Sequence, residues 1–60
     1  MKIFRNDENG LVFDTESNES WVRFERTADG MLEIDSSDSP TLDIWDIKTL
    51  RKWLKKAFRK

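Results

Sequence analysis

Two polar turns, each ending in a glycine and flanked by apolar residues, constrain the first half of this chain to β-hairpins. The first turn ends in Gly10, and such a turn between two apolar segments is a typical hairpin signal. A four-residue loop at 7–10, with Gly10 in the left-handed conformation, pairs Phe4 with Phe13 and places both rings on one face of the sheet. The sequence therefore predicts a first hairpin over residues 2–14.

The second hairpin is predicted over residues 21–35, after a polar linker. A three-residue loop that ends in Gly30 pairs Phe24 with Ile34. A two-residue loop would set the charged Glu25 opposite Ile34, on the apolar face. Because a slip of one residue reverses the two faces of a strand, we expect the longer loop.

The C-terminal segment predicts an amphipathic helix over residues 43–59, after a loop at 36–41. Asp43 is a good N-cap residue, and Asp46 falls at the third helical position, near the positive end of the helix dipole. Five apolar residues follow helical spacing and form one stripe: Ile47, Leu50, Leu54, Ala57 and Phe58.

These elements predict one α+β domain over residues 1–60: a small antiparallel sheet of two hairpins (β-β-β-β-α) packed against the C-terminal helix. The sheet face toward the helix is expected to carry Phe4, Leu11, Phe13, Val22, Phe24, Leu32 and Ile34. The opposite face, called the outer sheet face below, is expected to carry Ile3, Val12, Trp21 and Met31 among charged residues. A domain of this size without cysteine is marginally stable alone, so a monomer and a homodimer both remain open.

Acidic and basic residues are separated along the chain. Residues 1–46 hold all twelve carboxylates and four basic residues, a formal charge of −8, whereas residues 47–60 hold seven basic residues and no acid, a charge of +7. Such asymmetry indicates a charged partner or an internal electrostatic match. We expect the carboxylates to serve solubility, with imitation of nucleic-acid phosphates as the alternative.

The outer sheet face is the first predicted binding surface. Apolar patches rimmed by charge are typical of interfaces, and Trp and Arg are enriched among the residues that dominate binding energy. The predicted protein-binding residues are Trp21, Arg23, Met31, Val12, Ile3 and Arg5. The same interface would also serve a homodimer.

The basic helix provides an alternative, a nucleic-acid-binding surface. Its predicted residues are Lys48, Lys52, Lys55, Lys56, Arg59 and Trp45, with Trp53 nearby. The cations would contact phosphates while an indole stacks on a base. The competing interpretation is that the lysines complement the negative end of the helix dipole and the acidic sheet.

Several function classes are not expected. The absence of His and Cys removes the commonest general base and the best nucleophile, so we predict no enzyme and no small-molecule substrate. No metal or cofactor is expected, because the acidic strings at 35–39 and 7–10 lack the further ligands of the metal loops they resemble. Early charge argues against a signal peptide, and no stretch approaches the ~20 apolar residues of a membrane span. The expected compartment is the cytoplasm.

The helix resembles that of short phage and prophage proteins built from a few strands and a helix. The matching positions are Leu42, Asp43, Asp46, Ile47, Leu50, Trp53, Leu54 and Ala57. The resemblance implies an inhibitor or accessory factor of host machinery that acts in the host cytoplasm by protein–protein contact, as anti-CRISPR proteins do. A structural or assembly subunit is the second alternative to this function.

Overall fold

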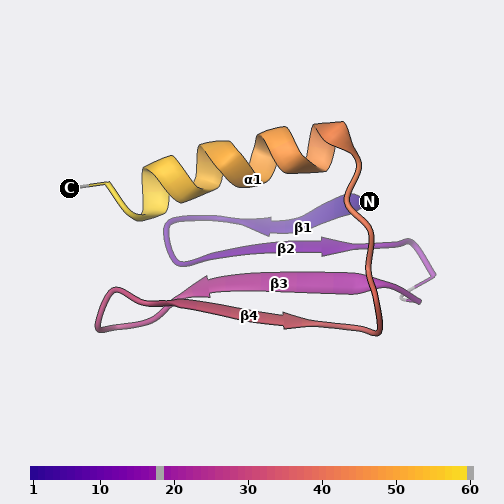
Figure 1. Ribbon diagram of the computed structural model, residues 1–60, viewed down its shortest axis with the longest axis horizontal. Helices are drawn as coiled ribbons and strands as arrows, with labels where there is room; N and C mark the ends of the chain where they lie inside the picture. The colour runs from indigo at the N-terminus through magenta and orange to yellow at the C-terminus, as the bar shows by residue number, and fades with distance from the viewer. Residues whose placement is uncertain (18, 60) are drawn as a thin grey trace.

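The computed structural model describes residues 1–17 and 19–59; Asn18 of the predicted linker and Lys60 of the basic segment lie outside the described residues. Four strands, β1 (Lys2–Asn6), β2 (Gly10–Asp14), β3 (Trp21–Arg26) and β4 (Leu32–Ser36), form an antiparallel sheet in the order β1-β2-β3-β4 (Figure 1). The helix α1 (Ile44–Ala57) follows them. The predicted α+β fold of two hairpins and a C-terminal helix is confirmed.

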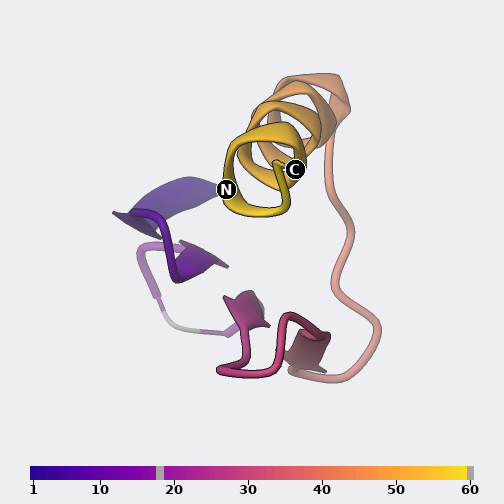
Figure 2. The same cartoon turned by 90° about the vertical axis from the view of Figure 1, so that its left-hand side faces the viewer.

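The sheet curls beneath the helix, and the helix does not cover it evenly. Figure 2 shows α1 on the side of β1 and β2, with β4 at the far side of the sheet. Among the four strands, α1 lies closest to β2. The linker at 37–43 leaves the end of β4 and runs past the ends of the strands to the start of α1 (Figures 1 and 2). The inner side of β4 is therefore the least covered part of the sheet.

The second hairpin has the predicted register. Phe24 pairs with Ile34, and the turn contains Gly30 at φ 82°, a left-handed conformation that glycine adopts without steric cost. The amide of Gly30 donates to the carbonyl of Thr27, which closes the turn. The strand continues one residue further than expected, to Ser36, so the following loop begins at residue 37.

The first hairpin has the predicted loop but not the predicted register. Asn6 pairs with Leu11, as a loop at 7–10 requires, but the register then shifts between Ile3 and Arg5, so that Ile3 pairs with Phe13. Phe4 is the extra residue of this β-bulge and is 58% exposed, so its predicted place opposite Phe13 in the core is wrong. A bulge changes which residues of a strand share a face, and the apolar pattern of three residues does not reveal it.

The left-handed conformation predicted for Gly10 is also wrong, since the residues with positive φ in the described part of the chain are Gly30 and Ser39. Gly10 instead leaves room for the guanidinium of Arg5: a Cβ atom at position 10 would lie 2.8 Å from Cζ of Arg5, a contact that this flexible side chain could relieve by shifting. Asp7 shapes this turn, because its carboxylate accepts the amide hydrogens of Asn9 and Gly10 at 2.8 and 2.9 Å.

The buried face of α1 differs from the predicted stripe. Trp53 is 1% exposed and lies in the core with Leu11, Phe13, Val22, Phe24 and Ala57. Leu50, Leu54 and Phe58 are only half-buried, and Ile47 is 52% exposed. At ~100° per residue, the buried face is rotated by roughly 70° from the centre of the predicted stripe. The rotation buries the side chain of Trp53, whose indole Nε1 donates to the carbonyl of Asp7 at 2.7 Å.

The start of α1 is capped as predicted. The carboxylate of Asp43 accepts the amide hydrogen of Asp46 at 2.9 Å, and the carboxylate of Asp46 accepts that of Asp43 at 3.2 Å, which together form a capping box. Asp46 is buried and also contacts the amino group of Met1 at 3.3 Å. The cap therefore joins the helix to the beginning of β1.

We expect the protein to lose stability in acid because the carboxylates of Asp43 and Asp7 must then be protonated. The hydrogen bond from the amide of Asp46 lowers the pKa of Asp43 below 3.8, and the Arg5 guanidinium, followed by the turn amides, lowers the pKa of Asp7 in the same way. A lowered folded-state pKa contributes stability above the unfolded value that is lost as the pH falls through the folded value. The urea midpoint should stay constant above about pH 5 and fall below about pH 4. Asp43→Asn keeps a capping side chain and should show a weaker fall; an unchanged pH profile in this variant would contradict the assignment.

Candidate binding surfaces

The outer sheet face is a network of ion pairs. Arg5 contacts Asp7 at 2.8 Å and Glu25 at 3.3 Å, and Arg23 contacts Asp35 at 2.9 Å across β3 and β4. The hydrogen bond to Asp7, ahead of that to Glu25, raises the pKa of Arg5 above its usual value. Both guanidinium groups of this face are therefore already paired with carboxylates.

The residues predicted to form one protein-binding patch do not all lie together. Val12, Arg23 and Arg5 share the outer sheet face, and the Arg23 guanidinium lies 6.0 Å from the centre of the Trp21 ring. Ile3 lies on the other side of the sheet, where it lines a hollow with Trp53 of α1, because the bulge reverses the faces of β1 at that point.

Met31 is also separated from the rest of the predicted patch. It is exposed in the turn beyond β3, where its carbonyl accepts the amide hydrogen of Thr27. Trp21 is the first residue of β3, whereas Met31 lies beyond the last. The two side chains are therefore separated by roughly the length of the strand, ~20 Å at 3.3 Å per residue. The apolar part of the predicted patch is therefore Trp21 and Val12, both only half-exposed.

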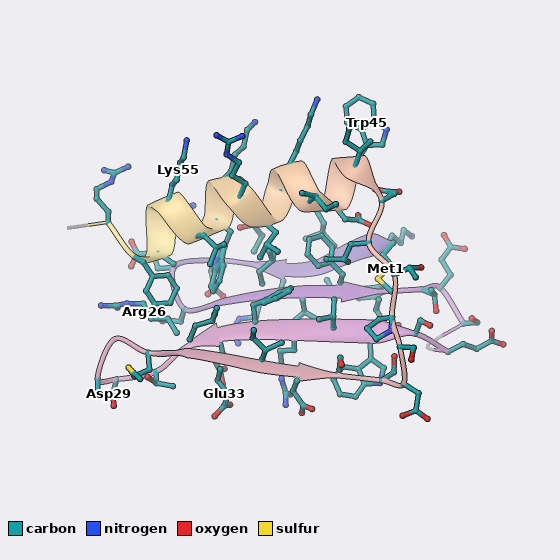
Figure 3. The ribbon with its side chains drawn as sticks, in the orientation of Figure 1. Met1, Arg26, Asp29, Glu33, Trp45 and Lys55 are labelled. Atoms are coloured by element: carbon teal, nitrogen blue, oxygen red, sulfur yellow. The ribbon has the colours of Figure 1, made fainter. Side chains whose placement is uncertain are left out.

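The exposed side of α1 forms a second surface, the basic helix face, composed of Trp45, Lys48, Arg51, Lys52 and Lys55 around an open hollow of about 570 Å³. Trp45 is 70% exposed, and the Lys48 ammonium lies 4.9 Å from the centre of its ring. Figure 3 shows Trp45 and Lys55 pointing away from the sheet. In residues 1–17 and 19–59, no ion pair joins these cations to a carboxylate.

Three of the sequence predictions for this surface need adjustment. Trp53 cannot stack on a base, because it is buried in the core. Lys56 and Arg59 lie instead around a separate hollow with Glu8 and Arg26, near the end of α1. Arg51 belongs to the basic helix face although it was not among the predicted residues. Its spacing of three and four residues from Lys48 and Lys55 would have placed it there.

A third surface was not predicted as a binding site. We call it the open apolar face; it consists of Leu32, Ile34, Ile47, Leu50, Leu54 and Phe58. Ile34 is 60% exposed and pairs with Phe24, whose ring lies 6.4 Å from that of Trp53. The ring of Trp53 in turn lies 5.9 Å from that of Phe58. These contacts connect the exposed residues of β4 to the half-buried side of α1 through the core.

The open apolar face arises from the position of the helix. Thr49, Lys52 and Lys56 border Ile3 of β1, so Leu50, Leu54 and Phe58, on the other side of Trp53, face β3 and β4. Because α1 lies toward β1 and β2, the inner side of β4 has no helix above it (Figure 2). The sequence did indicate this face, because the apolar stripe of α1 is wider than one pair of strands can cover. It did not indicate where the helix lies across the sheet.

Comparison with family models, curated proteins and solved structures finds no match for this chain. Among the described residues, no helix has the length and hydropathy needed to cross a membrane, and no three acidic side chains converge as metal ligands would. The three surfaces are therefore compared on their own geometry.

Proposed function

We propose that this chain is a non-enzymatic binding protein that acts by protein–protein contact, as an inhibitor or accessory factor of the phage type. The observation that supports this proposal is the open apolar face, where Ile34 and Ile47 are more than half exposed beside the core. Full burial of one such side chain contributes about 1.5–3 kcal/mol. Large apolar side chains that adjoin one another on a surface are typical of interfaces.

The open apolar face is a better candidate for the main contact than the outer sheet face. Arg5 and Arg23 already pair with carboxylates of the sheet, and a partner would have to compete with those pairs. Ile34 and Ile47 have no such competing contacts, so covering them costs little desolvation. Trp21 and Arg23 stay candidates for a secondary contact at the edge of the same partner.

A photoreactive side chain at position 47 is expected to form covalent adducts with the partner in a cell lysate, whereas the same side chain at position 55 should not. Position 55 is the matched control, because Lys55 lies on the basic helix face of the same helix. Introducing Ile34→Ser, on the same face but in β4 rather than α1, should reduce the adduct at position 47 about tenfold, as a loss of roughly 1.4 kcal/mol implies. Equal labelling at both positions, or none at position 47, would contradict the proposal; an adduct of twice the chain mass would identify a homodimer.

Nucleic-acid binding is a second candidate, supported by the basic helix face. Four cations and an exposed indole lie together on it without carboxylate partners in the described residues. Cations that met the acidic sheet would be unavailable to phosphates, and Lys55 points away from the sheet (Figure 3). The carboxylates of the sheet lie in the opposite layer of the molecule.

If the basic helix face binds nucleic acid, fluorescence titration with short single- and double-stranded DNA and RNA should show binding that weakens steeply with salt. Together α1 and Arg59 offer at most six cations for phosphate contacts, with Lys56 included. Six such contacts predict a loss of about 10³ in affinity between about 50 and 200 mM salt. Trp45→Phe should remove most of the fluorescence change. Affinity that is unaffected by Lys52→Glu together with Lys55→Glu would exclude this surface.

A further inference from the structure

The two edges of the sheet are protected unequally. β1 carries a bulge at Phe4 and basic side chains at Lys2 and Arg5, which are common devices against strand addition. β4 pairs with β3 in a regular register from Ser36 to Leu32, with no bulge, and all five of its residues are exposed. The edge of β4 is therefore the one that can accept another strand.

The hydrogen-bond pattern shows which backbone groups of β4 face outward. The amide of Ser37 donates to the carbonyl of Trp21, and the amide of Thr27 donates to the carbonyl of Met31. Because bonding alternates along an antiparallel pair, Glu33 and Asp35 direct their backbone groups toward β3, and Leu32 and Ile34 direct theirs outward. The outward amide of Ser36 is already bonded to the side chain of Asp35 at 3.0 Å. Leu32 and Ile34 therefore offer two donors and two acceptors to an incoming strand.

The side chains of β4 specify what such a strand should contain. Leu32 and Ile34 belong to the open apolar face, whereas Glu33 and Asp35 lie on the outer sheet face, where Figure 3 shows Glu33 pointing away from α1. Asp35 pairs with Arg23, but Glu33 has no cation within ion-pair distance in the described residues. The unpaired Glu33 and the already paired Asp35 lie on one side of the strand, and the apolar residues lie on the other, so the strand favours a basic and apolar complement.

A second copy of the chain fits this edge poorly. If two β4 strands paired antiparallel about a two-fold axis at Ile34, Glu33 of one copy would lie opposite Asp35 of the other. A shift of the axis to Glu33 would place Glu33 opposite itself. Like charges directly opposite each other destabilise a strand pair, so charge disfavours self-pairing in either register.

We propose that β4 binds an extended segment of a partner protein in which apolar residues alternate with basic ones, and that this segment adds to the sheet as a fifth strand. The inference rests on the proposed function and specifies the partner's chemistry at the open apolar face. The apolar residues of the segment lie beside Leu32 and Ile34, beneath the uncovered side of α1. Its basic residues lie beside Glu33 and Asp35. Main-chain hydrogen bonds contribute affinity and the alternating side chains contribute specificity.

The test uses the full chain and a synthetic peptide of about six residues, a common strand length, in which valine alternates with lysine. Amide hydrogen exchange is followed by NMR with and without saturating peptide. The amides of Leu32 and Ile34 should exchange at least about tenfold more slowly with peptide, because pairing removes them from water. The exchange of the β1 amides should not change, since the bulged edge accepts no strand.

Charge specificity provides the controls. A peptide with glutamate in place of lysine should bind at least about tenfold more weakly, and Glu33→Lys should reverse this preference. Glu16→Lys, an equal change of charge away from β4, should leave it unaltered. A valine–lysine peptide methylated on the nitrogens that face β4 should give no protection.

The proposal is overturned if Leu32 and Ile34 gain no protection, if the glutamate peptide binds equally well, or if protection depends on protein concentration alone. That last result would identify a second copy as the occupant. If specific adducts form at position 47 but the β4 amides gain no protection, the proposal of a fifth strand is wrong and the proposed function still stands. If neither adducts nor protection of β4 are found, both the fifth strand and the proposed function are wrong.

Discussion

Replacing Trp53 with alanine is expected to unfold the protein at room temperature. Trp53 is 1% exposed, its ring contacts those of Phe24 and Phe58, and its indole donates a hydrogen bond to the carbonyl of Asp7. Loss of a buried Trp typically costs about 3–5 kcal/mol. The core of a domain of this size rarely supplies more than about 3–5 kcal/mol in total, so the variant should have no stable folded state.

Circular dichroism and guanidine unfolding of the variant check this prediction, with Trp45→Ala as the matched control on the same helix. Trp45 is 70% exposed, so its removal should change the free energy of unfolding by no more than about 0.5 kcal/mol. The free energy of unfolding of Trp53→Phe should lie between those of the two alanine variants, because phenylalanine keeps a ring but leaves the Asp7 carbonyl without its donor. A cooperative transition in Trp53→Ala near that of the wild type would show that α1 does not pack through this residue.

The second large effect is expected for Phe13→Ala, and comparison with Phe4→Ala tests the register of the first hairpin. Phe13 is fully buried and its ring meets that of Phe24 edge to face at 6.4 Å, so its removal should cost about 3–5 kcal/mol. Phe4 is the extra residue of the bulge and is 58% exposed, so its removal should cost about 0.5 kcal/mol or less.

Urea unfolding of the two variants distinguishes the bulged hairpin from the regular one: Phe13→Ala should show little or no cooperative transition, whereas Phe4→Ala should unfold close to the wild-type midpoint. In a regular hairpin Phe4 would lie opposite Phe13 on the core face, and both variants would be strongly destabilised. Ile3→Ala supplies the complementary result. Ile3 pairs with Phe13 on the helix-facing side, so its removal should cost more than that of Phe4 although the two exposures are similar.

Local patterns predicted most elements because their causes are local. The cap at Asp43 depends on residues three apart, and the register of the second hairpin depends on the left-handed Gly30 and on keeping Glu25 off the core face. The location of the basic residues on α1 follows from helical spacing. Each of these features is contained within a few neighbouring residues.

The candidate sites were less predictable because surfaces combine distant residues. The patch predicted around Trp21 assumed that Ile3 and Met31 share its face and its end of the sheet, but Ile3 lies on the other face and Met31 lies at the other end. The open apolar face was overlooked because its residues were all expected in the core. Whether Ile34 and Ile47 are covered depends on where α1 lies across the sheet, and that position is not encoded in either segment alone.

The sequence by itself determined four strands, one capped helix and the separation of charge along the chain. Only the tertiary structure decided which apolar residues are buried. The bulge at Phe4 reverses β1, and the burial of Trp53 with its hydrogen bond to Asp7 rotates α1 toward β1 and β2. The physical reason is that one short helix cannot cover four strands: with the face of α1 that carries Trp53 and Ala57 packed on the sheet, other apolar residues of α1 and β4 stay exposed or half-buried.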